Sequence, residues 1–212
     1  MTKPTKPVAP RLLRIGIDFD NTTVKSGKLK SDYAWNFFRK NIPPPMFRRK
    51  WVVNSLKILT FKEYQQIREA IYKNIKTAYR LDDVDGALHF LRALIEEGHY
   101  ITVITSQQGF GLKIVKAYLA RHKLAINYVG VGYGKTKANA AKRLKLDVFM
   151  DDDVHKLEKL VGVVPYLFLH DWAYNGNDQV DPNVIERVGD EHICAWERFY
   201  ERIHEIENER DP

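Results

Sequence analysis

The chain has 212 residues, of which 44% are hydrophobic and 29% are charged, and its formal net charge is +7. This composition predicts a globular protein with one substantial core, and beyond the first ten residues it excludes a low-complexity chain. No apolar run reaches the length that crosses a membrane, so we expect no membrane partner. The single cysteine, Cys194, cannot form an internal disulfide, and no secretory signal is recognisable, so we expect a reducing, cytoplasmic setting.

The N-terminal segment combines a tail with the first strand. Residues 1–10 are rich in proline and predict a flexible tail, and an apolar, β-branched run predicts a strand over 13–19. Side chains alternate along a strand, so Asp18 and Asp20 project to the same side if the strand persists. Two carboxylates this close need a cation, a proton on one of them, or water around both. The pattern indicates either a Mg²⁺ site with one nucleophilic and one proton-transferring carboxylate, or a solvated loop.

Residues 24–80 do not follow the alternation of strands and helices, and we predict a helical cap there. Helices are expected over 33–41 and 47–59, on either side of three consecutive prolines. Thr60 and Glu63 then form a capping box that begins a third helix, which carries Tyr64, Ile67, Ile71 and Ile75.

This predicted cap is strongly basic. From Lys25 to Arg80 there are fourteen Lys or Arg against three Asp or Glu, a net charge of +11, which attracts anions. Most of its aromatic side chains are expected to pack in the core of amphipathic helices. Phe37, Phe38 and Trp51 are the candidates for stacking on a nucleobase.

The second predicted strand also ends in polar side chains. Helical patterns are predicted over 84–95, which Gly98 ends, and over 112–119. Between them, a buried strand over 100–105 ends at Thr105 and Ser106. Their hydroxyls and the amides that follow suit a phosphate oxygen.

Two lysines follow the third predicted strand, over 128–131. A glycine-rich turn leads to Lys135 and Lys137 and then to a helix marked by Ala138, Ala141 and Leu144. Lys137 lies nearer to the helix start and is favoured as a phosphate-binding side chain. Lys135 is the alternative, because in the glycine turn it can simply be solvated.

A second acidic cluster follows a predicted strand over 148–151. Asp151, Asp152 and Asp153 stand at the beginning of a helical pattern. A helix N-terminus stabilises one such carboxylate by ~0.3 to 1 kcal/mol, which explains one acid as a cap but explains three poorly.

With a further strand over 166–170, these elements predict a three-layer α/β fold. Helical connections between the strands imply right-handed crossovers and a parallel sheet whose strand ends meet at one edge. We therefore expect a Rossmann-like core over 11–23 and 81–212, with the helical cap over 24–80 inserted after the first strand.

Four of these motifs together resemble the haloacid dehalogenase-like (HAD) phosphohydrolases. The D-x-D-x-T motif of that family is matched by Asp18, Asp20 and Thr22, and its strand ending in Ser or Thr by Thr105 and Ser106. Its lysine near a helix start and its acidic pair follow in the same order, the pair at Asp151 and Asp152. Four motifs in order are far more specific than any one of them.

The resemblance implies a role for each of these residues. Asp18 would attack phosphorus to give an aspartyl-phosphate, and Asp20 would protonate the leaving oxygen and later deprotonate water. Mg²⁺ would be held by Asp18, by the Asp20 backbone carbonyl and by Asp152. Asp151 or Asp153, together with Thr22, would orient these ligands without binding the metal themselves.

The closing part of the chain resembles deoxyribonucleotidases. The resemblance rests on HDWAYN at residues 170–175, on Arg187-Val188 and on Ala195-Trp196-Glu197. It implies that the substrate is a deoxynucleoside monophosphate. The alternative is that Trp172, Tyr174 and Trp196 only pack against the sheet edge.

Three functions remain open from the sequence. The first is a Mg²⁺-dependent phosphatase of (deoxy)nucleoside monophosphates or another small phosphate ester. The second is a polynucleotide end-phosphatase, and the third is a non-catalytic module that binds nucleic acid, both favoured by the basic cap. The presence of Asp20 speaks against the third, and the oligomeric state is not indicated.

Overall fold

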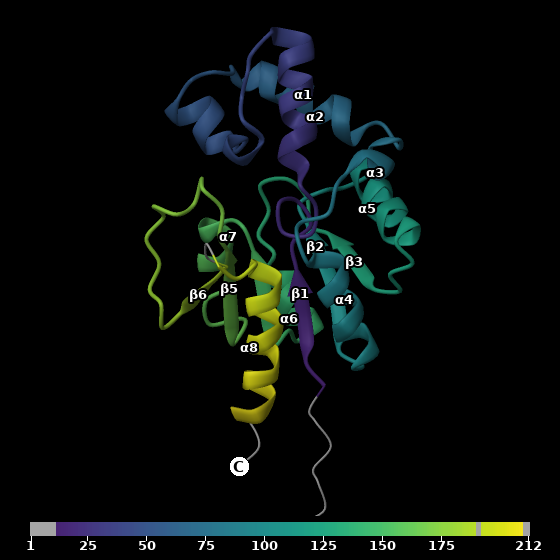
Figure 1. The fold of residues 1–212 in the computed structure, drawn as a ribbon, viewed down its shortest axis with the longest axis vertical. Helices are drawn as coiled ribbons and strands as arrows, with labels where there is room; N and C mark the ends of the chain where they lie inside the picture. Colours follow the sequence, from purple (N-terminus) through teal and green to yellow (C-terminus); the bar gives the residue numbers. More distant parts are fainter. Residues whose placement is uncertain (1–11, 190–191, 210–212) are drawn as a thin grey trace, which may run out of the picture.

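A computed structural model describes residues 12–189 and 192–209 of the chain (Figure 1). The predicted tail over residues 1–10 lies outside this described part. Within it, no helix is both long enough and apolar enough to cross a lipid bilayer.

A sheet of six parallel strands forms the centre of the fold, in the spatial order β3-β2-β1-β4-β5-β6. In the middle of the sheet, Ile15 pairs with Ile101 on one side and with Val148 on the other. The strands are β1 (Arg14–Ile17), β2 (Tyr100–Thr105), β3 (Asn127–Gly130), β4 (Val148–Asp151), β5 (Tyr166–His170) and β6 (Ile185–Val188).

The strand predictions are confirmed for β2, β4 and β5, while β3 is shifted by one residue and β1 is shorter at both ends. The edge strand β6 was not predicted. Its two inner residues, Glu186 and Arg187, are polar, and only Ile185 and Val188 are buried, so the segment lacks a continuous apolar run.

Helices cover both faces of the sheet, which confirms the three-layer α/β prediction. On one face, α4 (Ala87–Glu96), α5 (Phe110–Arg121) and α8 (Ala195–Glu209) pack in the same buried cluster as Ile15 and Ile17. On the other face, α6 (Ala138–Leu144) and α7 (Val154–Glu158) pack around Phe149.

Gly16 shows why the two faces of β1 differ. A Cβ atom at this position would lie 2.4 Å from side-chain atoms of Leu146 and Phe149. Glycine therefore leaves the room that the Phe149 ring occupies on the α6 and α7 side, where close packing tolerates no extra methyl group.

Residues 24–80, which we call the insert, form a group of helices between β1 and β2. Figure 1 shows α1 and α2 lying beyond the carboxyl ends of the strands. Buried residues of the insert, Leu29, Ile67 and Ile71 among them, belong to the same cluster as Ile15. The elements are α1 (Ser26–Phe38), the 3₁₀ turn η1 (Pro44–Met46), the π-helix η2 (Lys50–Ser55), α2 (Phe61–Tyr72) and α3 (Thr77–Arg80).

Two helix predictions in the insert need correction. The first helix begins at Ser26 rather than at residue 33, and the helix expected over 47–59 is only the six residues of η2. The β-branched Val52-Val53 pair is a poor helix former, and Lys57 has a φ of 51°, which ends any helix there.

The third helix of the insert was predicted correctly at its start. The Thr60 hydroxyl accepts a hydrogen bond from the Glu63 amide at 3.2 Å, and the Glu63 carboxylate accepts one from the Thr60 amide at 2.6 Å. Ile75 was expected to continue this helix, but it lies beyond the end of α2 and is exposed.

Candidate active site

The candidate site lies where β1, β2 and β4 end. Asp18 follows β1 directly, is buried, and its amide donates to the Met150 carbonyl at 2.9 Å. The chain then turns sharply, with Asn21 at a φ of 60°, a backbone conformation that asparagine tolerates better than most residues. The Thr23 hydroxyl stabilises the turn by donating to the Asp18 carbonyl at 2.8 Å.

Three buried carboxylates from the two acidic motifs meet at this edge. Asp18, Asp151 and Asp152 each offer an oxygen atom, and these atoms all lie within 4.8 Å of one another. The parallel pairing of β1 with β4 brings Asp18 and Asp151 together although they are 133 residues apart in the sequence. The structure therefore places together the acids that the sequence motifs singled out.

Two lysines neutralise much of this negative charge. Lys137, at the start of α6, donates to Asp18 Oδ1 and, at 2.7 Å, to Asp151 Oδ2. Lys156, on α7, lies 3.3 Å from Asp151 Oδ1 and 3.7 Å from Asp18 Oδ2. Of the two lysines weighed from the sequence, Lys137 is thus the one that contacts the acids.

The three acids differ in pKa. Burial raises the pKa of Asp152 to about 7, with Asp151 and Asp18 adding repulsion against the attraction of Lys156. For Asp151, burial is outweighed by Lys137 and Lys156, which lower its pKa to about 2. Burial and the charge of Asp151 raise the pKa of Asp18.

The donor set fits a divalent, oxygen-preferring cation. Asp18 Oδ2 is buried and has no hydrogen-bond partner within the described residues, although such an atom is normally satisfied. Carboxylate oxygens are the ligands that Mg²⁺ prefers, and a cation here would also relieve the repulsion that raises the pKa of Asp152.

Asp20 stands apart from this cluster and is held by other side chains. The Tyr72 hydroxyl of α2 donates to Asp20 Oδ1, and the side-chain amide of Gln107 donates to Asp20 Oδ2 at 2.9 Å. Burial alone would raise its pKa, but the charge of Lys30 and these two hydrogen bonds lower it. The insert thus contributes two of the groups that set the charge state of Asp20.

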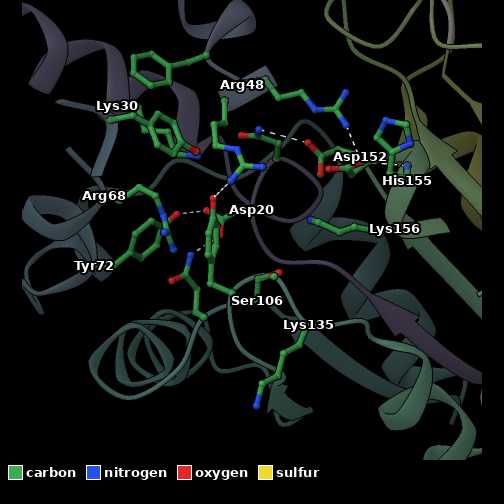
Figure 2. A pocket seen from close by; sticks show the side chains of 18 of the residues that line it. Asp20, Lys30, Arg48, Arg68, Tyr72, Ser106, Lys135, Asp152, His155 and Lys156 are labelled. Carbon is green, nitrogen blue, oxygen red and sulfur yellow. Dashed lines mark hydrogen bonds and ion pairs between the residues drawn. The ribbon is translucent and has the colours of Figure 1, made fainter. Parts of the chain in front are cut away.

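A cavity of about 350 Å³ opens between the insert and the sheet edge (Figure 2). Of the residues predicted from the sequence to belong to the site, Asp20, Ser106, Lys135, Asp152 and Asp153 line it. Lys137 is buried and does not line the cavity. The Thr105 hydroxyl accepts a hydrogen bond from the backbone amide of Gln107 at 3.1 Å. The remaining lining residues are Asn21, Lys30, Phe47, Arg48, Arg49, Tyr64, Arg68, Tyr72, Gln107, Tyr133, Gly134, His155, Lys156 and Lys159.

The aromatic candidates for substrate stacking do not lie in this cavity. Phe37 is 53% exposed near the end of α1, where its ring contacts Phe38, and the Trp51 indole donates to the Tyr174 carbonyl at 3.0 Å. Helical periodicity could not separate them from the rings that do line the cavity, which are Phe47, Tyr64, Tyr72 and Tyr133.

Thr22 and Asp153 support the site differently from what the motif implied. The Thr22 hydroxyl is buried without a hydrogen-bond partner in the described part of the chain, and the neighbouring Thr23 makes the contact with Asp18. Asp153 caps α7 through the His155 amide at 3.1 Å and pairs with Arg48 at 2.8 Å.

The HDWAYN segment contacts the acidic cluster directly. The Tyr174 hydroxyl donates to Asp152 Oδ2, and the Asn175 amide donates to the Asp152 carbonyl at 3.0 Å. The Trp172 indole donates to the Asn21 carbonyl at 2.6 Å, and the Trp196 indole to the Thr22 carbonyl at 2.8 Å. These side chains therefore orient the site as well as packing beside the sheet.

Several site residues were missed from the sequence. Lys30 is buried four residues after Ser26, whose hydroxyl accepts from it at 2.8 Å, and a buried lysine gives no periodicity signal. Lys156 lies five residues after Asp151 on α7, so helix geometry could have suggested it. Tyr72 and Gln107 have no local signal, because the fold alone brings them to Asp20.

Comparisons with known proteins agree on the fold. No protein-family model matches the chain, and no curated protein sequence does either. Among solved structures, the chain is similar to a protein described as a predicted phosphatase from Clostridium acetobutylicum, with 17% identity and a TM-score of 0.61. That match covers 92% of this chain and 100% of the other.

Two further structures extend the likeness. A hydrolase from Pseudomonas syringae has 17% identity and a TM-score of 0.59, over 92% of this chain and 99% of the other. A HAD-superfamily hydrolase from Ehrlichia chaffeensis has 12% identity and a TM-score of 0.53, over 94% and 98%. The chain therefore has the α/β fold of HAD-superfamily hydrolases, and its acidic cluster lies at the carboxyl edge of that sheet.

Proposed function

We propose that the protein is a Mg²⁺-dependent phosphatase that removes phosphate from (deoxy)nucleoside monophosphates through an aspartyl-phosphate. The observation that carries this proposal is the buried cluster of Asp18, Asp151 and Asp152, with Lys137 bound to two of its members. A pair of lysines is too little to neutralise this cluster and a phosphate together. A bound cation supplies the missing positive charge and stabilises charge on the transferring oxygens.

In the first step, an Asp18 carboxylate oxygen forms a bond to phosphorus while the bond from phosphorus to the ester oxygen breaks. Asp20 gives its proton to the departing oxygen, so the product leaves as an alcohol. Lys137 holds Asp18 in place and offsets charge on the phosphoryl oxygens. Ser106, which lines the cavity, would donate a hydrogen bond to one of these oxygens.

In the second step, Asp20 takes a proton from a water molecule whose oxygen attacks phosphorus. The bond from phosphorus to Asp18 breaks and inorganic phosphate leaves. Tyr72 and Gln107 favour the ionised form of Asp20, which is the form that this step requires. The insert would act as a cap, because it carries Tyr72 and closes the cavity over Asp20.

Two features support a nucleotide as the substrate. The side chains that carry the deoxyribonucleotidase resemblance, Tyr174 and Asn175, both contact Asp152. The cavity of about 350 Å³ also has an exposed aromatic ring on its wall, that of Tyr133, against which a base can stack.

A panel of phosphate esters assayed with Mg²⁺, and again with a chelator, tests this proposal. We expect nucleoside monophosphates to be hydrolysed faster than sugar phosphates, with activity lost on chelation. Asp18→Asn should abolish turnover, and Asp20→Asn should lower it by roughly a hundredfold through lost proton transfer. Full activity in either variant contradicts the mechanism.

The basic insert favours a second candidate function, that of a phosphatase acting on polynucleotide ends. Its fourteen Lys or Arg between Lys25 and Arg80 favour a polyanion. Phosphate-terminated oligonucleotides that outcompete mononucleotides for hydrolysis would establish it. Tight, salt-sensitive DNA binding without any hydrolysis in Mg²⁺ would instead establish the non-catalytic binding module.

A further inference from the structure

Two arginines of the insert meet at one tyrosine on the wall of the cavity. The Arg68 guanidinium carbon lies 4.2 Å from the centre of the Tyr133 ring, and that of Arg49 lies 5.5 Å from it. Arg49 also donates a hydrogen bond to the Tyr133 hydroxyl. Tyr133 belongs to the loop between β3 and α6, so this contact joins the insert to the core.

Neither of these guanidinium groups is paired with a carboxylate of the described residues. Arg68 makes a hydrogen bond of 3.3 Å to the Gln65 side-chain oxygen, which carries no charge. Their neighbour Arg48 is different, because it lies 2.8 Å from Asp153 and 3.1 Å from Asp178. Two unneutralised cations that converge on one ring repel each other unless an anion joins them.

The cavity as a whole carries more positive charge than one phosphate can neutralise. Seven Lys or Arg side chains line it against three Asp, and when the buried Lys137, Asp18 and Asp151 of the adjoining cluster are counted with them the net charge is +3. A phosphomonoester brings about −1.5 to −2 at neutral pH, and a divalent cation beside Asp18 would add to the positive side. The positive charge that one phosphate leaves unbalanced therefore favours a second anionic group on the same ligand.

Arg68 and Asp152 lie on different sides of the cavity. Figure 2 shows Arg68 beside Tyr72 on the side formed by the insert, and Asp152 and Lys156 across the cavity from it. A phosphate over Asp18 would thus be separated from one at Arg68 by part of the ligand. Guanidinium groups bind phosphate oxygens through paired hydrogen bonds, which lysine cannot match.

We propose that Arg49, Arg68 and Tyr133 bind a second phosphate of the substrate, and that the preferred substrate is a nucleoside 3′,5′-bisphosphate. One phosphate is removed at Asp18 while the other stays at the arginine pair. The separation of the two walls favours phosphates on opposite sides of a sugar over adjacent ones. The nucleoside part of this inference rests on the proposed function, whereas the second phosphate rests on the arginine pair alone.

Binding to a variant that cannot turn over provides the test. Asp18→Asn protein in Mg²⁺ is titrated calorimetrically with deoxyadenosine 5′-monophosphate, the 3′,5′-bisphosphate, the 5′-diphosphate and a 5′-phosphorylated oligonucleotide. We expect the bisphosphate to bind at least about tenfold more tightly than the monophosphate, as a charge-assisted contact provides. That ratio should fall to about one when Arg49→Ala or Arg68→Ala is added.

Lys62→Ala is the matched control, since Lys62 is an exposed cation on the same helix as Arg68 and does not line the cavity. It should keep the tenfold ratio, and thermal unfolding checks that each variant is folded. Equal affinity for monophosphate and bisphosphate, or an unchanged ratio in both arginine variants, overturns the inference. So does tighter binding of the 5′-diphosphate or of the oligonucleotide than of the bisphosphate.

Steady-state assays of the wild-type protein separate the two proposals. Monophosphates hydrolysed as efficiently as bisphosphates would leave the proposed function intact and remove the second-phosphate site. Hydrolysis of sugar phosphates but of no nucleotide would remove the nucleotidase proposal. In that case, sugars with two phosphates should be compared with sugars with one. If the former bind more tightly in the wild type but not in Arg68→Ala, the second-phosphate site is supported without the nucleoside.

Discussion

Cation binding at the acidic cluster should depend on pH through Asp152. Burial and the charges of Asp151 and Asp18 raise the pKa of Asp152 to about 7, so below that pH its carboxyl group is largely protonated in the metal-free protein. A cation that uses this carboxylate must displace one proton. The affinity of the protein for the cation is therefore highest above pH 7 and decreases as the pH falls.

The size of the effect follows from the same pKa. Each pH unit below about 7 costs a factor of ten in affinity, or about 1.4 kcal/mol, for a site coupled to one proton. Because the carboxyl group is already half protonated at pH 7, the apparent affinity for Mg²⁺ should weaken by roughly fiftyfold between pH 7 and pH 5. Asp151 adds little to this slope, because Lys137 and Lys156 outweigh its burial and lower its pKa to about 2. Asp18, whose pKa is raised by burial and by the charge of Asp151, can only make the slope steeper.

Isothermal titration with Mg²⁺ at pH 5, 6, 7 and 8 measures the slope. Repeating it at pH 6 in two buffers of different ionisation enthalpy counts the protons released. Asp152→Asn is the control, and it should bind weakly with no such slope. An affinity for Mg²⁺ that stays constant from pH 5 to pH 7 in the wild-type protein would refute the coupling between Asp152 and the cation.

Three other predictions concern the supports of the site. Lys137→Ala leaves Asp18 and Asp151 buried with only the more distant Lys156 as a cation, so it should lower the free energy of unfolding by about 3 kcal/mol and abolish turnover, and a urea midpoint equal to that of the wild type would contradict this. Tyr72→Phe removes a donor to Asp20, so kcat should fall about tenfold and the acid limb of the pH–rate profile should move to higher pH, because the pKa of Asp20 rises; a profile that does not move argues against the contact. Gly16→Ala places a methyl group 2.4 Å from Leu146 and Phe149 and should cost about 1 to 3 kcal/mol in urea unfolding, whereas Gly162→Ala, in open space, should cost only the strain of its backbone.

The short range of strand and motif signals explains what was predictable. Apolar runs before Asp18, Thr105 and Asp151 defined three of the strands, because a strand buried on both faces needs little beyond its own sequence. Asp18, Asp151 and Asp152 could be singled out because they come at the ends of such runs, and Lys137 because it stands near a predicted helix start. β6 was missed because an edge strand with Glu186 and Arg187 at its centre has no such run.

Predictions failed in the insert, where local signals are weak. The capping box at Thr60 located the start of α2, yet η2 took the place of a full helix and α1 began seven residues earlier than expected. The aromatic rings of the insert could not be sorted by helical spacing. Phe37 is exposed and does not line the cavity, whereas Tyr64 and Tyr72 do, and this difference depends on how the helices pack over the sheet.

The amino-acid sequence by itself determined the class of fold and the acids that meet at its edge, because parallel strands carry their carboxyl ends to one side whatever the connections do. Only the tertiary structure decided which other side chains join them. Tyr72 and Gln107 reach Asp20, and Arg49 and Arg68 reach Tyr133, from elements far apart in the chain. Such contacts depend on the packing of the insert against the core, which leaves no periodic mark in the sequence.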